Sequence, residues 1–230
     1  MRRLILALVI TLALCGCATQ GVSSRSYTPP SQSPVKNEKV VGRPQAAVWD
    51  ELVKELSKSF YVINNIERES RIINVSFNSN SPNDYVDCGR SRRTYTQGDK
   101  TETYDYAVAE RATFKVAGNA QPNPSMISYA IANRVTSLEG RANIYVAPES
   151  GNSDKTVVSV NTRYILTVRV QAESFVQHFN GNILARTPMP SEPNSLIFNT
   201  NKESTTNLGA DTIVCAGRGK LENEILNMIR

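Results

Sequence analysis

The sequence predicts an α+β protein with a single curved antiparallel sheet packed against an N-terminal and a C-terminal helix. Three observations favour this class. An amphipathic helix pattern comes first, alternating strand patterns follow it, and a short helix pattern closes the chain. Because the helices and the strands occur in separate runs, we expect one antiparallel sheet with both helices on its apolar face.

The first helix is predicted over residues 45–60. Pro44 suits its start, since the N–H group that proline lacks has no partner in the first turn of a helix. Apolar residues recur at a spacing of four: Val48, Leu52, Leu56 and Phe60. This spacing places them in one stripe, which we expect to pack into the core.

Alternation of apolar and polar residues predicts the strands. A hairpin is expected over residues 61–79, where Ile73, Val75 and Phe77 alternate with polar residues. Longer strands are expected over residues 103–116, 138–147 and 157–170, with turn residues at 148–153 between the last two. The polar segments 80–100 and 180–208 are expected to be loops, and residues 219–229 the closing helix.

The N-terminus has the pattern of a secretory signal. Two arginines precede an uncharged run over residues 4–14, which is too short to span a bilayer. The Leu-Cys-Gly-Cys that follows at residues 14–17 resembles the lipobox of bacterial lipoproteins. This resemblance implies cleavage after Gly16 and a lipid on Cys17, whose several acyl chains would hold the protein on a membrane.

These features divide the chain into three expected parts. Residues 1–16 are the signal peptide, residues 17–43 are the lipidated cysteine with a flexible tether, and residues 44–230 are a periplasmic α+β domain. The tether is expected because its residues are mostly polar, with several serines and prolines. No Asp follows Cys17, and this resembles lipoproteins sorted to the outer membrane. We therefore expect a lipid-anchored protein that faces the periplasm, with no cofactor besides the lipid.

Cys88 and Cys215 are the two cysteines left after the N-terminal pair. An exported domain lies in an oxidising compartment, where such a pair usually forms a disulfide. Two buried, unpaired thiols are the alternative. A metal site is disfavoured because the chain has one histidine, His178, and no Cys-x-x-Cys motif.

The charge of the chain is mildly positive. The formal net charge of +5 includes the two arginines of the signal. Basic residues cluster only at Arg90, Arg92 and Arg93, and this cluster is too small for a nucleic-acid interface, so no nucleic-acid partner is expected. The cluster is either a solvated loop or a contact for anionic lipid.

The segment VWDELVKEL…YVINNIERESRIINVSF, after a lipidated cysteine and a polar tether, resembles the helix-grip domains of BamC-type outer-membrane lipoproteins. The resemblance covers residues 47–77 and the anchor. It implies a helix followed by a hairpin, and a non-enzymatic accessory module with an envelope protein as its partner. The chain departs from that family in having one large domain and in its Cys88 and Cys215 pair.

No enzyme is expected, because no catalytic constellation can be assembled from the sequence. Every nucleophile-base pair would depend on His178, and the Asp84 and Asp87 pair, a candidate calcium site, lies in a polar segment where carboxylates are usually solvated. We therefore expect a scaffold or accessory protein of envelope assembly or maintenance. The alternative is a carrier or sensor that binds a lipid or another apolar ligand between helix and sheet, for which a cavity would be needed.

Overall fold

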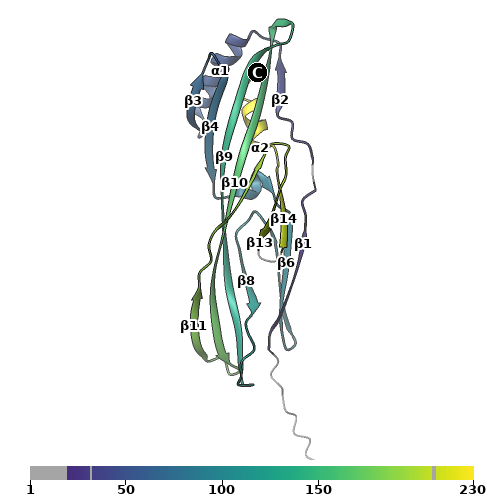
Figure 1. The fold of residues 1–230 in the computed structure, drawn as a ribbon, viewed down its shortest axis with the longest axis vertical. Helices are drawn as coiled ribbons and strands as arrows, with labels where there is room; N and C mark the ends of the chain where they lie inside the picture. The colour runs from purple at the N-terminus through teal and green to yellow at the C-terminus, as the bar shows by residue number, and fades with distance from the viewer. Residues whose placement is uncertain (1–19, 32, 209–210) are drawn as a thin grey trace, which may run out of the picture.

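The computed structural model describes residues 20–31, 33–208 and 211–230 (Figure 1). This part of the chain is mostly β-strand, arranged in three sheets, with two short α-helices. The predicted α+β class, with a single sheet against two helices, was therefore wrong. The difference comes from strands in segments whose polar composition had suggested loops or a tether.

The structure is built on one long antiparallel hairpin. Strands β9 (Met126–Glu149) and β10 (Asn152–His178) pair along nearly their whole length and run from one end of the molecule to the other (Figure 1). Gly151 forms the turn with a φ of +77°, a conformation that glycine adopts without steric cost. The position of the turn matches the sequence prediction, and both strands are longer than predicted.

The other strands of the eight-stranded sheet pair with one half of the hairpin or the other. One half, the upper half in Figure 1, holds β2 (Glu38–Val41), β3 (Val62–Glu67), β4 (Ile72–Ser79) and β12 (Asn194–Asn199). The lower half holds β8 (Ala112–Ala117) and β11 (Ile183–Met189).

In the upper half, helices α1 (Gln45–Lys58) and α2 (Lys220–Leu226) pack on the sheet. The predicted stripe of α1 is confirmed at Val48, Leu52 and Leu56, which are fully buried. Phe60 lies beyond the end of the helix and is exposed. Because a continuous cluster of buried side chains fills the space between helices and sheet, a ligand could not enter there without displacing the core.

In the lower half, a second sheet faces the hairpin. It consists of β1 (Val22–Thr28), β6 (Arg90–Gln97) and β7 (Lys100–Ala107), and it lies against β8. The rings of Tyr106 and Phe114 stack across this contact with centroids 5.7 Å apart, in a small cluster that includes Ala132. The lower half is therefore a two-layer β-sandwich.

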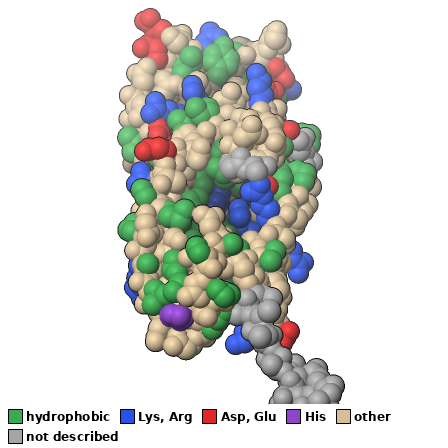
Figure 2. Space-filling view, turned by 60° about the horizontal axis from the view of Figure 1, so that its bottom comes forward, with side chains coloured by type: hydrophobic (Ala, Val, Ile, Leu, Met, Phe, Trp, Pro, Cys, Tyr) green, Lys and Arg blue, Asp and Glu red, His purple; other side chains and the backbone are tan. Residues whose placement is uncertain are grey.

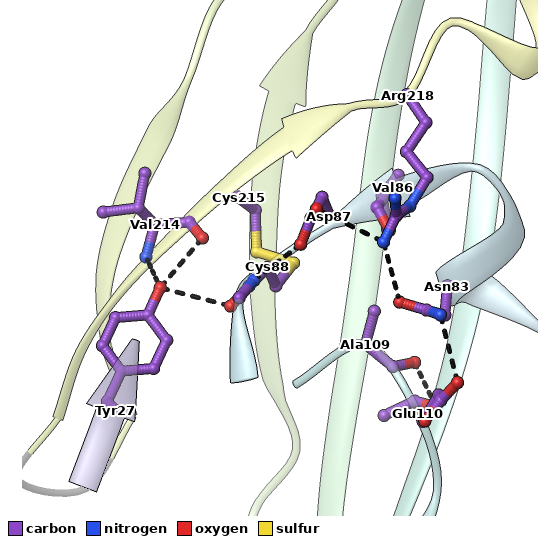
Figure 3. Close-up of a disulfide and its surroundings, with 12 residues drawn as sticks. Tyr27, Asn83, Val86, Asp87, Cys88, Ala109, Glu110, Val214, Cys215 and Arg218 are labelled. Atoms are coloured by element: carbon purple, nitrogen blue, oxygen red, sulfur yellow. Dashed lines mark hydrogen bonds and ion pairs between the residues drawn. A yellow bond between two sulfur atoms is a disulfide. The ribbon is translucent and has the colours of Figure 1, made fainter. Parts of the chain in front are cut away.

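A small third sheet joins the two halves. It contains β5 (Val86–Asp87), β13 (Ser204–Leu208) and β14 (Asp211–Gly217), and a short 3₁₀ helix (Pro82–Asp84) precedes β5. The predicted disulfide between Cys88 and Cys215 is confirmed, and it links the end of β5 to β14 (Figure 3).

The hydroxyl of Tyr27 ties β1 to this disulfide. Its oxygen accepts a hydrogen bond from the N–H of Val214 at 3.0 Å and lies 3.2 Å from the carbonyl oxygens of both Cys88 and Val214, one of which accepts its proton (Figure 3). Gly89, which follows Cys88 in the sequence, has a φ of +73°. A Cβ atom at this position would lie 2.1 Å from the carbonyl oxygen of Thr28. Only glycine lets these two segments of the backbone, at Thr28 and at Gly89, approach this closely.

Several polar segments form strands because a neighbouring strand, rather than burial, orders their backbone. Within the expected tether, β1 pairs with β6 and β2 pairs with β10. Within the expected loop at 180–208, all residues of β11 are exposed, so the alternation of buried and exposed residues by which strands are recognised is missing there. The strand expected at 103–116 is divided at residues 108–111 into β7 and β8.

We expect replacement of both Cys88 and Cys215 by serine to lower the free energy of unfolding by about 2–4 kcal/mol, because the bond restrains the unfolded chain over a separation of 127 residues. Urea denaturation of residues 20–230 measures the effect. A reductant should lower the unfolding midpoint of the wild type and leave that of the double variant unchanged. An identical midpoint for the oxidised and the fully reduced wild type would refute this.

Candidate functional site

A cavity of about 370 Å³ lies in the lower half, between the β1–β6–β7 sheet and strands β8, β9 and β10. Figure 2 shows it as a hollow with apolar and basic side chains at its wall. Its volume falls within the roughly 300–1,000 Å³ that is typical of small-molecule sites. The residues that line it come from both layers of the sandwich and from the β13–β14 hairpin, so no single stretch of sequence forms it.

The cavity exists because the inward face of the long hairpin changes along its length. Large inward side chains fill the upper half, among them Ile144, Tyr164 and Leu166. In the lower half the inward positions that line the cavity carry three alanines: Ala130, Ala132 and Ala172. Alanines at these positions leave open a volume that larger side chains occupy elsewhere on the same face.

Arg134 is the next inward residue of β9 after Ala132, and it lines the cavity. Only 4% of the surface of Arg134 is exposed. The Nη1 atom donates a hydrogen bond to the carbonyl oxygen of Glu110 at 2.6 Å, whereas the buried Nη2 atom has no partner among the described residues. Burial lowers the pKa of Arg134 to about 10, with Tyr106 opposing this shift and Arg93 adding to it. The guanidinium is therefore charged at neutral pH.

Glu222 provides a contrast, since it and Arg134 are the two charged residues that are buried in the described part of the chain. Its carboxylate accepts hydrogen bonds from the hydroxyl groups of Tyr164, at 2.9 and 3.1 Å, and Thr200, at 2.7 Å. Glu222 lies on α2 in the packed upper half. Its polar atoms are satisfied within the protein, whereas those of Arg134 are not.

A second arginine lies close to Arg134. Arg93 of β6 also lines the cavity, donates a hydrogen bond from Nε to the hydroxyl of Tyr106 at 2.9 Å, and covers the ring of Phe114 at 4.4 Å. The guanidinium of Arg134 lies 5.8 Å from the centroid of the Tyr106 ring. Tyr106 therefore contacts both cations.

One ion pair lies among the remaining lining residues. Arg25 of β1 and Asp211 of β14 are 3.3 Å apart, and both line the cavity. Asp211 is the only acidic residue among the lining residues, against three arginines. After this pair is counted, the charges of Arg93 and Arg134 have no acidic counterpart in the lining.

The basic cluster predicted to be a loop or a lipid contact lies on strand β6, and alternation along the strand separates its members. Arg90 is exposed and forms an ion pair with Asp105 at 2.6 Å. Arg92 is also exposed, whereas Arg93 turns toward the cavity. Contact of Arg90 and Arg92 with anionic lipid stays a prediction.

The other residues considered from the sequence lie away from the cavity or outside the described part. Gly16 and Cys17 fall within residues 1–19, which the structure does not describe. Asp87 pairs with Arg218 at 3.3 Å (Figure 3), and Asp84 lies 3.7 Å from Lys220. His178 ends β10 at the lower end of the molecule, and within the described ranges no group of acidic, cysteine or histidine side chains could hold a metal ion.

Sequence reasoning missed Arg134, the lining residue whose buried Nη2 atom lacks a hydrogen-bond partner among the described residues. A signal for it exists, because the inward series of β9 extends back from Leu138 through Thr136 and Arg134 to Ala132. An arginine on the apolar face of a predicted strand is a rare arrangement. The series was not extended because the strand was expected to begin at residue 138.

Comparison with known proteins adds no relative: no family model, no curated protein and no solved structure matches the chain. The resemblance to BamC-type lipoproteins therefore stays a prediction. In the ranges that the structure describes, neither helix has the length and apolar character needed to cross a bilayer.

We expect Arg134→Met to raise the free energy of unfolding by about 1 kcal/mol, because it replaces a buried cation that lacks a counter-charge with an apolar side chain of similar length. Chemical denaturation measures the change. Arg169→Met is the matched control, since Arg169 is exposed on the other face of β10, and a change within about 0.5 kcal/mol is expected for it. A loss of several kcal/mol for Arg134→Met alone would show that the guanidinium stabilises the fold.

Proposed function

We propose that this protein is a lipid-anchored binding protein of the bacterial envelope, which holds an apolar ligand in the cavity of its lower half. The cavity itself is the observation that carries this proposal. It is lined largely by apolar side chains, and the hydroxyl of Tyr27 joins the β1–β6–β7 sheet on one side of it to the third sheet beside the Cys88–Cys215 disulfide. A concave, largely apolar surface of this size exposes apolar area that a ligand would bury, so its presence favours a role in binding.

The carrier expected from the sequence would bind its ligand between helix and sheet. We instead place the ligand between the two sheets of the lower half. The helix–sheet interface is filled by core side chains. The apolar side chains of Met189 and Leu208 line the cavity from strands β11 and β13. The scaffold role expected from the sequence stays a prediction.

The proposed anchor would place the lower half next to a membrane. Gln20, the first described residue, donates a hydrogen bond from Nε2 to the carbonyl oxygen of Ser128 at 2.9 Å, at the lower end of β9. Cys17 is only three residues earlier, a distance of at most about 11 Å in a fully extended chain. A lipid on Cys17 would therefore hold the lower end, and with it the cavity, close to the bilayer.

We expect a neutral naphthylamine dye, N-phenyl-1-naphthylamine, to bind with a saturable rise in fluorescence, because the cavity offers it an apolar environment. Ala132→Leu should abolish this binding by filling the cavity. The control is Asn133→Leu, which adds a leucine on the exposed face of the same strand and should leave binding unchanged. The proposal fails if the wild type gives no saturable binding, or if both variants bind as the wild type does.

For the anchor, we expect Cys17→Ala to abolish metabolic labelling with a palmitate analogue and to release the protein from membranes. The orientation is tested with Trp49→Phe/Phe179→Trp, which moves the single tryptophan from α1 to the lower end, where Phe179 is 41% exposed. Brominated lipid should quench this tryptophan and leave Trp49 of the wild type unquenched. Labelling of Cys17→Ala, or stronger quenching of Trp49, would contradict the proposal.

A further inference from the structure

On the basis of the proposed cavity, we infer that its ligand is a single-chain amphiphile with an anionic head group, such as a fatty carboxylate, whose head binds to Arg134 and Arg93. The proposed function requires only that the ligand is apolar, whereas an anionic head group is an additional property of the ligand.

The hydrogen bonding of Arg134 is incomplete. A buried guanidinium without a counter-charge is costly, since several kcal/mol per ion are lost when it leaves water. Nη1 has the carbonyl oxygen of Glu110 as its acceptor, whereas Nη2 has no acceptor among the described residues. A carboxylate or phosphate oxygen in the cavity would supply the negative charge that this guanidinium lacks.

Arg93 places a second positive charge at the same cavity. Its guanidinium faces the same cavity, and Tyr106 lies in contact with both arginines. The charge of Arg93 also disfavours the protonated form of Arg134. One anion bound beside both arginines would reduce the repulsion between these two cations. The contacts of Arg93 with Tyr106 and Phe114 fix the position of its guanidinium at the cavity wall.

An apolar wall lies beside the arginines. Phe114, Val116, Ala132 and Ala172 line the cavity together with Arg134. An inorganic anion would leave this wall without a partner, whereas an aliphatic chain would bury against it, with roughly 0.8 kcal/mol gained per buried CH₂ group. A volume of about 370 Å³ lies near the lower limit for small-molecule sites, which favours one chain over the two chains of a membrane phospholipid.

The test compares two ligands that share a twelve-carbon chain, dodecanoate and 1-dodecanol, as competitors of the bound naphthylamine dye. We expect dodecanoate to displace the dye at a concentration at least tenfold lower, as a charge-assisted hydrogen bond implies. Inorganic phosphate and acetate, which have the charge without the chain, should not displace the dye at millimolar concentrations.

Variants assign the head group to its residues. Arg134→Met and Arg93→Met should each reduce the difference between the two ligands to about twofold, by weakening the binding of dodecanoate more than that of 1-dodecanol. Arg92→Met is the matched control, because Arg92 lies next to Arg93 on the exposed face of β6, and the full difference should remain in it. Circular dichroism of each variant verifies that it is folded.

The outcomes separate this inference from the proposed function. Equal displacement by dodecanoate and 1-dodecanol would preserve the cavity as a binding site and overturn the anionic head group. Binding of phosphate as tight as that of dodecanoate would overturn the amphiphile. A difference that persists in both Arg134→Met and Arg93→Met would overturn the assignment to these residues, and failure of the dye and of every ligand to bind would overturn the proposed function itself.

Discussion

The pairing of β9 with β10 is the constraint on which the rest of the structure depends. Because side chains alternate strictly along a strand, one continuous face of this hairpin points inward from end to end. The residues on that face decide what each half becomes. Ile144, Tyr164 and Leu166 meet two helices and produce a solid core, whereas Ala132, Arg134 and Ala172 meet a second sheet and leave a cavity. The upper half of the β9–β10 hairpin thus forms the packed core, whereas its lower half forms the proposed binding site.

The lower half is braced around the cavity by contacts that need no ligand. The hydroxyl of Tyr27 joins β1 to the chain around the Cys88–Cys215 disulfide, and this disulfide joins β5 to β14 (Figure 3). The stacked rings of Tyr106 and Phe114 separate the layers beside the cavity. Collapse of the lower half would require these contacts to break.

Sequence patterns predicted the parts of the fold that bury an apolar face. The stripe of α1 and the alternation at Ile73, Val75 and Phe77 were recognised because each is amphipathic, and the disulfide followed from compartment and cysteine count. Strands β1 and β11 were missed because their exposed residues carry no such signal. The cavity could not be predicted, since it results from the absence of large side chains on strands distant in sequence.

The central claim is that an anionic amphiphile binds between the two sheets of the lower half. A crystal structure of the protein with 12-bromododecanoate tests it most directly, because the anomalous signal of bromine locates the chain. We expect bromine in the cavity beside Ala132 and Ala172, and the carboxylate within hydrogen-bonding distance of Arg134 or Arg93. Bromine between the helices and the sheet, or only on the outer surface with the cavity free of ligand, would contradict the account.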